Sequence, residues 1–316
     1  MRTDKSDPLV GFVPYGGLGN QLFQFATALS LQNEGNQRVA IDLVGDERMN
    51  LNGQPEIFDF QIEDISEIEF RLNGRSALLR RLINSQLRLS NKVFQNRFLN
   101  VFLTSFQGMF SKITSAIAGL KVLSPRGLGW DLKLKIPRKD FTILGNFHSY
   151  LFISEKVRAE LRNRLKSRNF SDAVKTFEKL AIDEKPVAIH IRLGDYLSIS
   201  ELNVINPDYF ARAIQLIETE CPHSNYWIFT NDEFLARQYI PTTISKRIRF
   251  IPQSLNSAQT IEVMWLCSSY IISNSTFSWW GAFLSRTVNP IVIAPSKWFK
   301  TTREPEFICP IDWKRI

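Results

Sequence analysis

The sequence predicts an α/β protein made of two doubly wound halves, each built on a parallel sheet. Three observations support this: the chain opens with a strand, a glycine turn, a helix and a strand; a polar break lies near its middle; and strands and helices alternate after that break. A length of 316 residues suits two domains, which we place at 1–180 and 181–316. We expect their sheets to face each other across a cleft.

The first half begins with the apolar stretch 9–13, which predicts a strand, and the glycine turn 16–20 follows directly. Apolar residues then recur at helical spacing over 21–32, and 38–43 reads as the next strand. Residues 71–126 are basic, with no acidic side chain, and their apolar spacing predicts a helical insertion over about 70–130. A strand at 141–147 and one helix over 155–180 complete this half.

The second half follows the polar break 183–186. Strands are predicted at 187–191, 226–230, 248–251, 270–273 and 291–294, and helices at 208–218, 260–267 and 279–285. Asn206 and Pro207 supply the cap and the first turn of the helix at 208–218. This alternation predicts a second parallel sheet.

Composition excludes several classes of protein. With 44% hydrophobic and 22% charged residues the chain is neither disordered nor fibrous. The 3 cysteines form no CxxC pair, and 3 histidines make a histidine-rich metal site hard to build. No signal peptide or apolar stretch long enough to span a membrane is found, so we expect a cytoplasmic location.

The net charge of +8 suits an anionic partner, which can be a nucleotide, a nucleic acid or a membrane surface. The basic segment 71–126 has two interpretations: a solvated face, or a peripheral contact with the anionic inner face of a membrane. A nucleic-acid partner is not expected, because no zinc-finger spacing or RNA-binding aromatic signature occurs.

The turn Gly16–Gln21 reads GGLGNQ between a strand and a helix. Helix N-terminal N–H groups attract anionic or polar ligands, and Asn20 is the side chain able to reach the cleft. A dinucleotide fingerprint would need glycine where Leu22 stands, so an NAD-dependent oxidoreductase is disfavoured. A plain turn with a helix cap is the alternative.

The segment His190–Tyr196 reads HIRLGDY and ends a buried strand. His190 and Arg192 point to the same side because side chains alternate along a strand. A guanidinium at a strand's carboxyl end suits a diphosphate. The alternative is a structural ion pair between Arg192 and Asp195.

Two further motifs follow strands. Thr230–Asn231–Asp232 could read ribose or base edges through Asn231 and Asp232, or could cap the next helix. In Asn274–Gly281 (NSTFSWWG), hydroxyl residues at a helix start form an anion cradle, while Trp279 and Trp280 are expected in the core. Glu262 could pair with guanine N–H donors, or be an exposed helix charge.

Taken together, GGLGNQLFQFA, HIRLGDY, TND and NSTFSWWGA, in this order, resemble the α-1,2-fucosyltransferases of glycosyltransferase family 11. The resemblance implies a GT-B architecture, an acceptor-side N-terminal domain and a donor-binding C-terminal domain. It implies inverting transfer of L-fucose from GDP-β-L-fucose to the 2-hydroxyl of a galactose in a glycan such as an O-antigen or a lipid-linked oligosaccharide. It implies no metal or other cofactor, in line with the absence of an Asp-x-Asp motif.

The resemblance also implies site residues. Arg192 would hold the β-phosphate, and Ser275, Thr276 and Phe277 would line the diphosphate and nucleoside pocket. Asn20 would lie near donor and acceptor. Two positions depart from the family pattern: Leu193 replaces a second arginine, and His148 replaces a common glutamine in a stretch expected to face the acceptor.

For the chemistry, Arg192 is expected to stabilise the leaving diphosphate. A general base would accept the proton of the acceptor hydroxyl, and Asp195 is the first candidate, with Glu201 and His148 as alternatives. Two other functions stay open: a fucosyltransferase with another acceptor or linkage, and a basic nucleotide- or nucleic-acid-binding protein without transferase activity.

Overall fold

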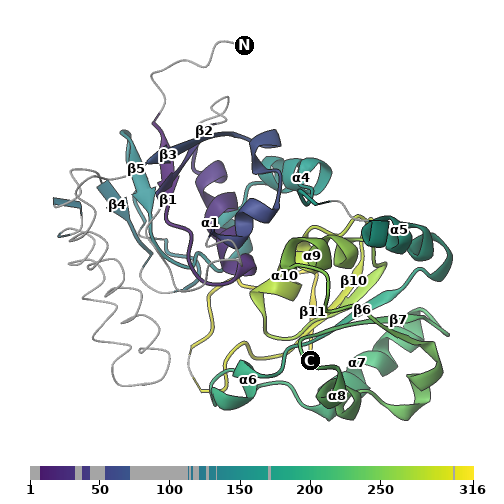
Figure 1. Ribbon diagram of the computed structural model, residues 1–316. Helices are drawn as coiled ribbons and strands as arrows, with labels where there is room; N and C mark the ends of the chain where they lie inside the picture. Colours follow the sequence, from purple (N-terminus) through teal and green to yellow (C-terminus); the bar gives the residue numbers. More distant parts are fainter. Residues whose placement is uncertain are drawn as a thin grey trace. The chain divides into compact units, whose positions relative to one another are not determined.

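The computed structural model describes residues 8–32, 38–42, 54–71, 113, 115–116, 121–125, 128–132, 134–169, 172–301 and 303–316. The chain forms two compact units. One is Met1–Leu165 together with Thr302–Ile308, and the other is Lys166–Thr301 together with Cys309–Ile316. We describe them separately, as the N-terminal and the C-terminal unit (Figure 1).

The N-terminal unit contains a parallel sheet of five strands in the order β3-β2-β1-β5-β4 among the described residues. The strands are β1 (Val10–Phe12), β2 (Arg38–Asp42), β3 (Glu67–Arg71), β4 (Lys121–Leu123) and β5 (Phe141–Ile143). From β1 the chain moves to β2 and β3 on one side, whereas β4 and β5 lie on the other. The strand order therefore reverses between β1 and β5, where ligands of such sheets bind.

The first helix of this unit, α1 (Leu18–Ser30), connects β1 to β2 and is buried over most of its length, including Leu22, Phe23 and Phe25. The other described helices are α4 (Glu155–Arg164) and the short 3₁₀ turns η1 (Glu56–Asp59), η2 (Ile62–Asp64) and η3 (Tyr150–Phe152). The helices predicted over 70–130 lie mostly outside the described residues, and the part described there includes the strand β4.

In the described part of the C-terminal unit, a parallel sheet has six strands in the order β11-β10-β9-β6-β7-β8. The strands are β6 (Val187–Ile191), β7 (Tyr226–Thr230), β8 (Ile248–Phe250), β9 (Ser269–Ile271), β10 (Ile291–Ala294) and β11 (Lys314–Arg315). Here the strand order reverses between β6 and β9. The predicted α/β class with two parallel sheets, as in a GT-B protein, is confirmed.

Helices cover both faces of this second sheet: α7 and α8 lie on one side, and α5, α9 and α10 on the other (Figure 1). Their bounds are α5 (Asp172–Glu184), α6 (Asp195–Ser198), α7 (Pro207–Glu220), α8 (Glu233–Ala236), α9 (Ser257–Trp265) and α10 (Thr276–Phe283), with 3₁₀ turns η4 (Arg237–Tyr239) and η5 (Thr242–Arg247). The start of α7 is the predicted one, because the Asn206 side chain accepts from the Tyr209 N–H and Pro207 opens the helix.

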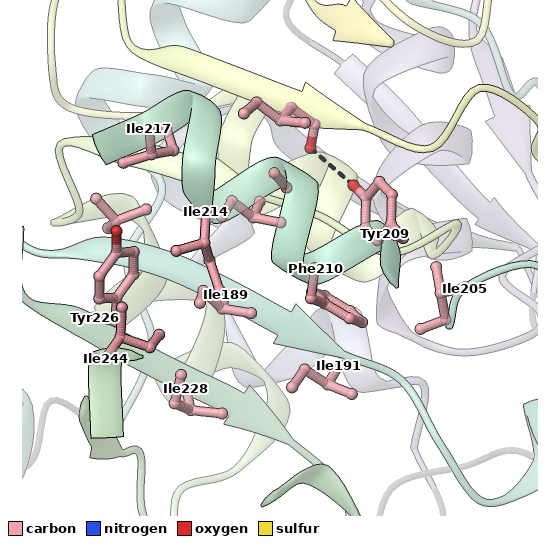
Figure 2. Packing of buried hydrophobic residues seen from close by; sticks show 14 of the residues in the cluster. Ile189, Ile191, Ile205, Tyr209, Phe210, Ile214, Ile217, Tyr226, Ile228 and Ile244 are labelled. Carbon is pink, nitrogen blue, oxygen red and sulfur yellow. Dashed lines mark hydrogen bonds between the residues drawn. The ribbon is translucent and has the colours of Figure 1, made fainter. Parts of the chain in front are cut away.

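The core between β6, β7 and α7 explains which way the site residues point (Figure 2). Every second residue of β6 and its extension belongs to this cluster: Val187, Ile189, Ile191 and Leu193. Period-two alternation then places His190 and Arg192 on the opposite face. Leu193, where the family pattern has a second arginine, is fully buried in this core.

The helix predicted over 155–180 is wrong in one respect: it is two helices, α4 and α5, and the described residues 165–169 that follow α4 are not helical. The connection leaves helical geometry because Ser167 is buried and bonds elsewhere. Its N–H and its hydroxyl both donate to the Glu262 carboxylate, at 3.2 and 2.6 Å. This tertiary contact, absent from any local pattern, outweighs helix propensity.

Candidate functional site

The candidate site of the C-terminal unit lies where β6 and β9 end. These strands are parallel neighbours, with Ile189 opposite Ile271. Just beyond that register, His190 Nδ1 lies 2.6 Å from the Ser273 hydroxyl oxygen. This buried hydrogen bond joins the HIRLGDY loop to the NSTFSWWG loop, so the two motifs meet at the point where the strand order reverses.

His190 is a neutral residue of this site. Burial lowers its pKa to about 3, and the charge of Arg192 acts in the same direction. Arg192 lies two positions after His190, on the same face of the chain. The Phe277 ring also lies beside His190, with centroids 5.8 Å apart. A neutral imidazole can form hydrogen bonds here without repelling the arginine.

Arg192 is half-buried rather than turned into the interior. Its guanidinium carbon lies 5.5 Å from the centre of the Tyr196 ring, close enough for a cation–π contact. Arg192 comes directly after β6, on the same side as His190, so it supplies a positive charge at the carboxyl edge of the sheet.

The start of α10 provides hydrogen-bond donors without a negative charge. The Ser275 hydroxyl accepts from the Phe277 N–H at 3.3 Å, and no acidic residue lies in the first turn. Ser278 donates to the Ser275 carbonyl at 3.2 Å. Thr276 and Phe277 are half-buried. An acid-free helix start at the same sheet edge as an arginine favours an anion.

Two tryptophans support this turn from inside the unit. Trp279 and Trp280 are fully buried, as predicted, and Trp279 stacks on Phe283 with ring centroids 4.3 Å apart. The aromatic packing fixes α10, and with it the direction of its first N–H groups.

Three predicted ligand-binding residues have structural partners. The Asn231 amide bonds to the backbone of Leu193. Asp232 caps α8 by accepting from the Leu235 N–H at 2.9 Å, which was the alternative interpretation. Glu262 is buried, and Ser167 and Arg286 engage its two oxygens. The structure therefore gives each of these side chains a task within its own unit.

In the N-terminal unit, the predicted residues Asn20 and His148 come together. Asn20 Oδ1 lies 3.0 Å from His148 Nε2. Asn20 follows β1 and His148 follows β5, so the pair marks the place where this strand order reverses. Gly16, at φ +72°, allows the turn, since a Cβ there would stand 2.5 Å from the Asn20 amide nitrogen.

His148 is neutral like His190, because burial lowers its pKa to about 3. An asparagine oxygen only accepts hydrogen bonds, so Nε2 carries the proton and Nδ1 is the unprotonated nitrogen. Among the described residues Nδ1 has no hydrogen-bond partner. The lowered pKa makes the His148 imidazole a weak base. Its buried Nδ1 can still accept a hydrogen bond.

The start of α1 differs from that of α10, since a carboxylate of the protein already occupies it. Glu56 Oε2 accepts from the Leu18 N–H at 2.6 Å. The GGLGNQ turn was expected to attract an anionic or polar ligand, and the residue that meets this requirement is Glu56. No local signal marked Glu56, which lies 38 positions away from Leu18.

The three candidates for the general base differ in their surroundings. The Glu201 carboxylate accepts from the Thr301 N–H at 3.0 Å and from the Thr301 hydroxyl. His148 bonds to Asn20. Asp195 begins α6, three positions past Arg192, and its side chain lies outside the described residues.

Asn274 was not predicted as a site residue, although it opens the NSTFSWWG motif. Its amide nitrogen donates to the carbonyls of Leu202 and Trp298, both at 2.9 Å. Its Oδ1 is buried and has no hydrogen-bond partner among the described residues. Asn274 therefore ties two neighbouring loops to the end of β9.

Within the described ranges, no group of three or more His, Cys, Asp or Glu side chains is placed to hold a metal ion. In the same ranges we find no helix with the length and apolar character needed to cross a membrane. The expected independence of a metal stays a prediction, and the basic segment 71–126 lies mostly outside the described residues.

Comparison with known proteins gives concordant results. The sequence profile described as Glycosyl transferase family 11 matches residues 132–316. The chain is 27% identical over 315 residues to an Escherichia coli α-1,2-colitosyltransferase, covering 95% of this chain and 96% of the relative. It is 27% identical over 304 residues to the E. coli O-antigen biosynthesis glycosyltransferase WbnK, covering 90% and 93%. Among solved structures, fucosyltransferase NodZ from Bradyrhizobium aligns with a TM-score of 0.46 at 12% identity, covering 87% of this chain and 92% of NodZ.

Proposed function

Since the chain belongs to glycosyltransferase family 11, we propose that it transfers L-fucose from GDP-β-L-fucose to the 2-hydroxyl of a galactose residue, with inversion at the anomeric carbon. The acceptor is a glycan such as an O-antigen or a lipid-linked oligosaccharide. An α-1,2 linkage and a role in O-antigen assembly agree with the names of the two E. coli relatives.

One observation carries the proposal: Arg192, the neutral His190 and the acid-free start of α10 share the carboxyl edge of one sheet. A guanidinium forms charge-assisted, often bidentate bonds to phosphate, and helix N–H groups add a positive partial charge. A sugar nucleotide presents a diphosphate, which fits this combination better than a neutral ligand does.

Catalysis then follows from charge. The bond between fucose and the diphosphate breaks, and negative charge grows on the leaving oxygen. The first N–H groups of α10 are held by the packed tryptophans, and the Arg192 guanidinium lies over Tyr196, so both groups would stabilise this charge more in the transition state than in the bound substrate. The protein's own positive groups would thus do what a metal ion does in other transferases.

The acceptor hydroxyl must lose its proton, and Asp195 is the base in this proposal because the two alternatives, His148 and Glu201, already have partners. The pKa of His148, lowered to about 3, makes its imidazole a weak base. Glu201 is held by Thr301. Asp195 begins α6 three positions after Arg192, so one short segment would act on both the leaving group and the attacking hydroxyl.

A second donor sugar has specific support, because one relative is named as a colitosyltransferase. Colitose and fucose therefore have to be compared as donors. The phosphate-binding edge would act identically on either sugar, so this choice depends on the sugar pocket.

The test is a transferase assay on the purified chain with GDP-fucose and GDP-colitose, in EDTA, against a panel of galactose-terminated disaccharides. We expect one donor to give an α-linked product at O2 of galactose, as read by NMR. Absence of transfer, together with no GDP binding by calorimetry, would refute the proposal. Co-sedimentation with anionic vesicles tests separately whether the 71–126 segment brings the enzyme to a membrane surface.

A further inference from the structure

The loop that carries Arg192 has an unusual support at its base. The ladder between β6 and β7 ends with Ile191 opposite Thr230. Arg192 and Leu193 continue beyond this last pair, and buried backbone N–H and C=O groups there still need hydrogen-bond partners. The backbone of β7 does not supply these partners, because its pairing with β6 ends at Thr230.

The side chain of Asn231 supplies them instead. Its Oδ1 accepts from the Leu193 N–H at 2.9 Å, and its Nδ2 donates to the Leu193 carbonyl at 3.2 Å. A primary amide carries one acceptor and one donor side by side, as a peptide group does. Asn231 therefore extends the ladder by one residue, with a side chain in place of the backbone.

Two further contacts fix the same short loop. The Leu193 side chain is fully buried and belongs to the same core cluster as Ile191 and Phe210. Gly194 has φ +67°, and a Cβ at that position would stand 2.8 Å from Asn231 Nδ2. The glycine thus lets the chain turn directly over the amide.

This arrangement sets the direction of Arg192. With the backbone of Leu193 held by Asn231 and its side chain held in the core, the preceding residue must project to the opposite face of the sheet, beside His190. On that face, the Arg192 guanidinium lies over the Tyr196 ring.

We propose that Asn231 is a positioning residue, which aims Arg192 through the backbone of Leu193 rather than reading the donor itself. The inference rests on the proposed function for the role of Arg192. It assigns to the TND motif a task different from recognition of ribose or base edges.

The first experiment is a double-mutant cycle in the transferase assay. Asn231→Ala should lower kcat by about 10- to 100-fold with little change in the KM of the acceptor, since a misplaced group costs transition-state stabilisation. In the Arg192→Ala background the same change should cost less than about 2-fold, because its target is gone. If the fold losses of the two single variants multiply in the double variant, Asn231 acts independently of Arg192, and the proposal is overturned.

The matched control is Asn225→Ala. Asn225 precedes the other end of β7, and its amide also bonds a backbone carbonyl, that of Glu184, at 3.3 Å. We expect transfer within about 2-fold of wild type for this asparagine-to-alanine change. Gly194→Ala serves as a second variant, since its methyl group displaces the Asn231 amide without removing it, and it should reproduce the kcat loss.

A readout without activity separates this inference from the proposed function. In ¹⁵N spectra of arginine side chains, the Arg192 Nε signal should shift toward that of a free arginine in Asn231→Ala and stay in place in Asn225→Ala. An unchanged signal in both variants would overturn the positioning role even if the enzyme proves to use another donor. If the wild type does not transfer sugar from GDP-sugars, but the Arg192 Nε signal shifts in Asn231→Ala as expected, only the proposed function is refuted.

Discussion

The two sheets of this protein carry their motifs at the same topological position, but the helix starts at these positions differ in charge. In the N-terminal unit the helix that starts after β1 already holds a carboxylate, because Glu56 accepts from the Leu18 N–H. In the C-terminal unit the helix that starts after β9 is capped by the hydroxyl of Ser275, and Arg192 stands at the end of the neighbouring strand. Each site also has a neutral buried histidine, His148 or His190.

Under the proposed function, the strand topology would determine where a ligand binds, and the local charge would determine which ligand binds there. An anionic diphosphate is repelled where Glu56 lies and attracted where Arg192 and α10 lie. The uncharged Asn20–His148 pair suits a ligand with hydroxyl groups, such as an acceptor sugar. The assignment of donor to one unit and acceptor to the other therefore has a physical basis that variants can test.

The largest expected effect is that of removing the positive charge from the C-terminal site. Arg192→Ala should lower turnover by about 10²–10³-fold and leave the fold intact, because the lost group acts on charge that develops in the transition state. Steady-state kinetics with circular dichroism as the folding check measure this. Arg237→Ala, which removes an exposed arginine on η4, should retain wild-type turnover, and comparable losses in both variants would contradict the assignment.

The next effect comes from making the start of α10 resemble that of α1. Ser275→Asp keeps a good helix cap but adds a negative charge, so GDP binding should weaken by about 10- to 100-fold. The asparagine of Ser275→Asn has nearly the same size as the aspartate and caps a helix equally well, but it carries no charge. Calorimetry should show GDP binding by the asparagine variant within a few-fold of wild type. Equal losses for the two variants would indicate that size rather than charge decides.

A third prediction concerns the neutral buried histidine that each of the two sites contains. The pKa values of His148 and His190 fall from 6.5 to about 3 on folding, so the unfolded chain takes up protons that the folded chain does not. Stability is therefore complete above pH 6.5 and decreases as the pH falls from there toward 3, by about 2 kcal/mol per histidine between pH 7 and pH 5. Glu184 and Glu218, with pKa values lowered from 4.5, contribute only at lower pH.

Hydrogen exchange resolves the two histidines, because they lie in different units. His148→Gln should flatten the pH dependence of protection in β1 and β5 and leave that of β6 and β9 unchanged. The exposed His223, in the turn after α7, provides the control: His223→Asn should leave both profiles as in the wild type. An unchanged profile of β1 and β5 in His148→Gln would contradict the buried neutral state.

Much of this architecture follows from the sequence because its signals are local. Apolar runs followed by polar motifs identified β1, β6, β7 and β9, and the Asn206–Pro207 pair identified the start of α7. The meeting of His190 with the serine-rich turn also follows, since carboxyl ends of parallel strands share one edge.

What the sequence did not predict depends on partners distant in the chain. Glu262 was expected to bind a base or face solvent, and instead holds Ser167 across 95 positions. Glu56 reaches the start of α1 from the 3₁₀ turn η1, 38 positions along the chain. The strand β11 has only two residues, too few for any periodic pattern. The sequence predicts ligand binding by Asn231 and gives no signal for its bonds to the Leu193 backbone, which lies 38 positions away.

The smallest expected effect removes the negative charge from the N-terminal site. Glu56→Gln keeps an oxygen that can accept from the Leu18 N–H but loses the interaction of a carboxylate with the helix dipole, about 0.5 kcal/mol of unfolding free energy. GDP affinity should not change, because the proposed diphosphate site lies in the other unit. Glu155→Gln, an exposed charge in the first turn of α4, is the matched control for the dipole term. If Glu56→Gln instead tightened GDP binding, the start of α1 would be an anion site that Glu56 blocks, and the contrast between the two sheet edges would no longer decide which unit takes the donor.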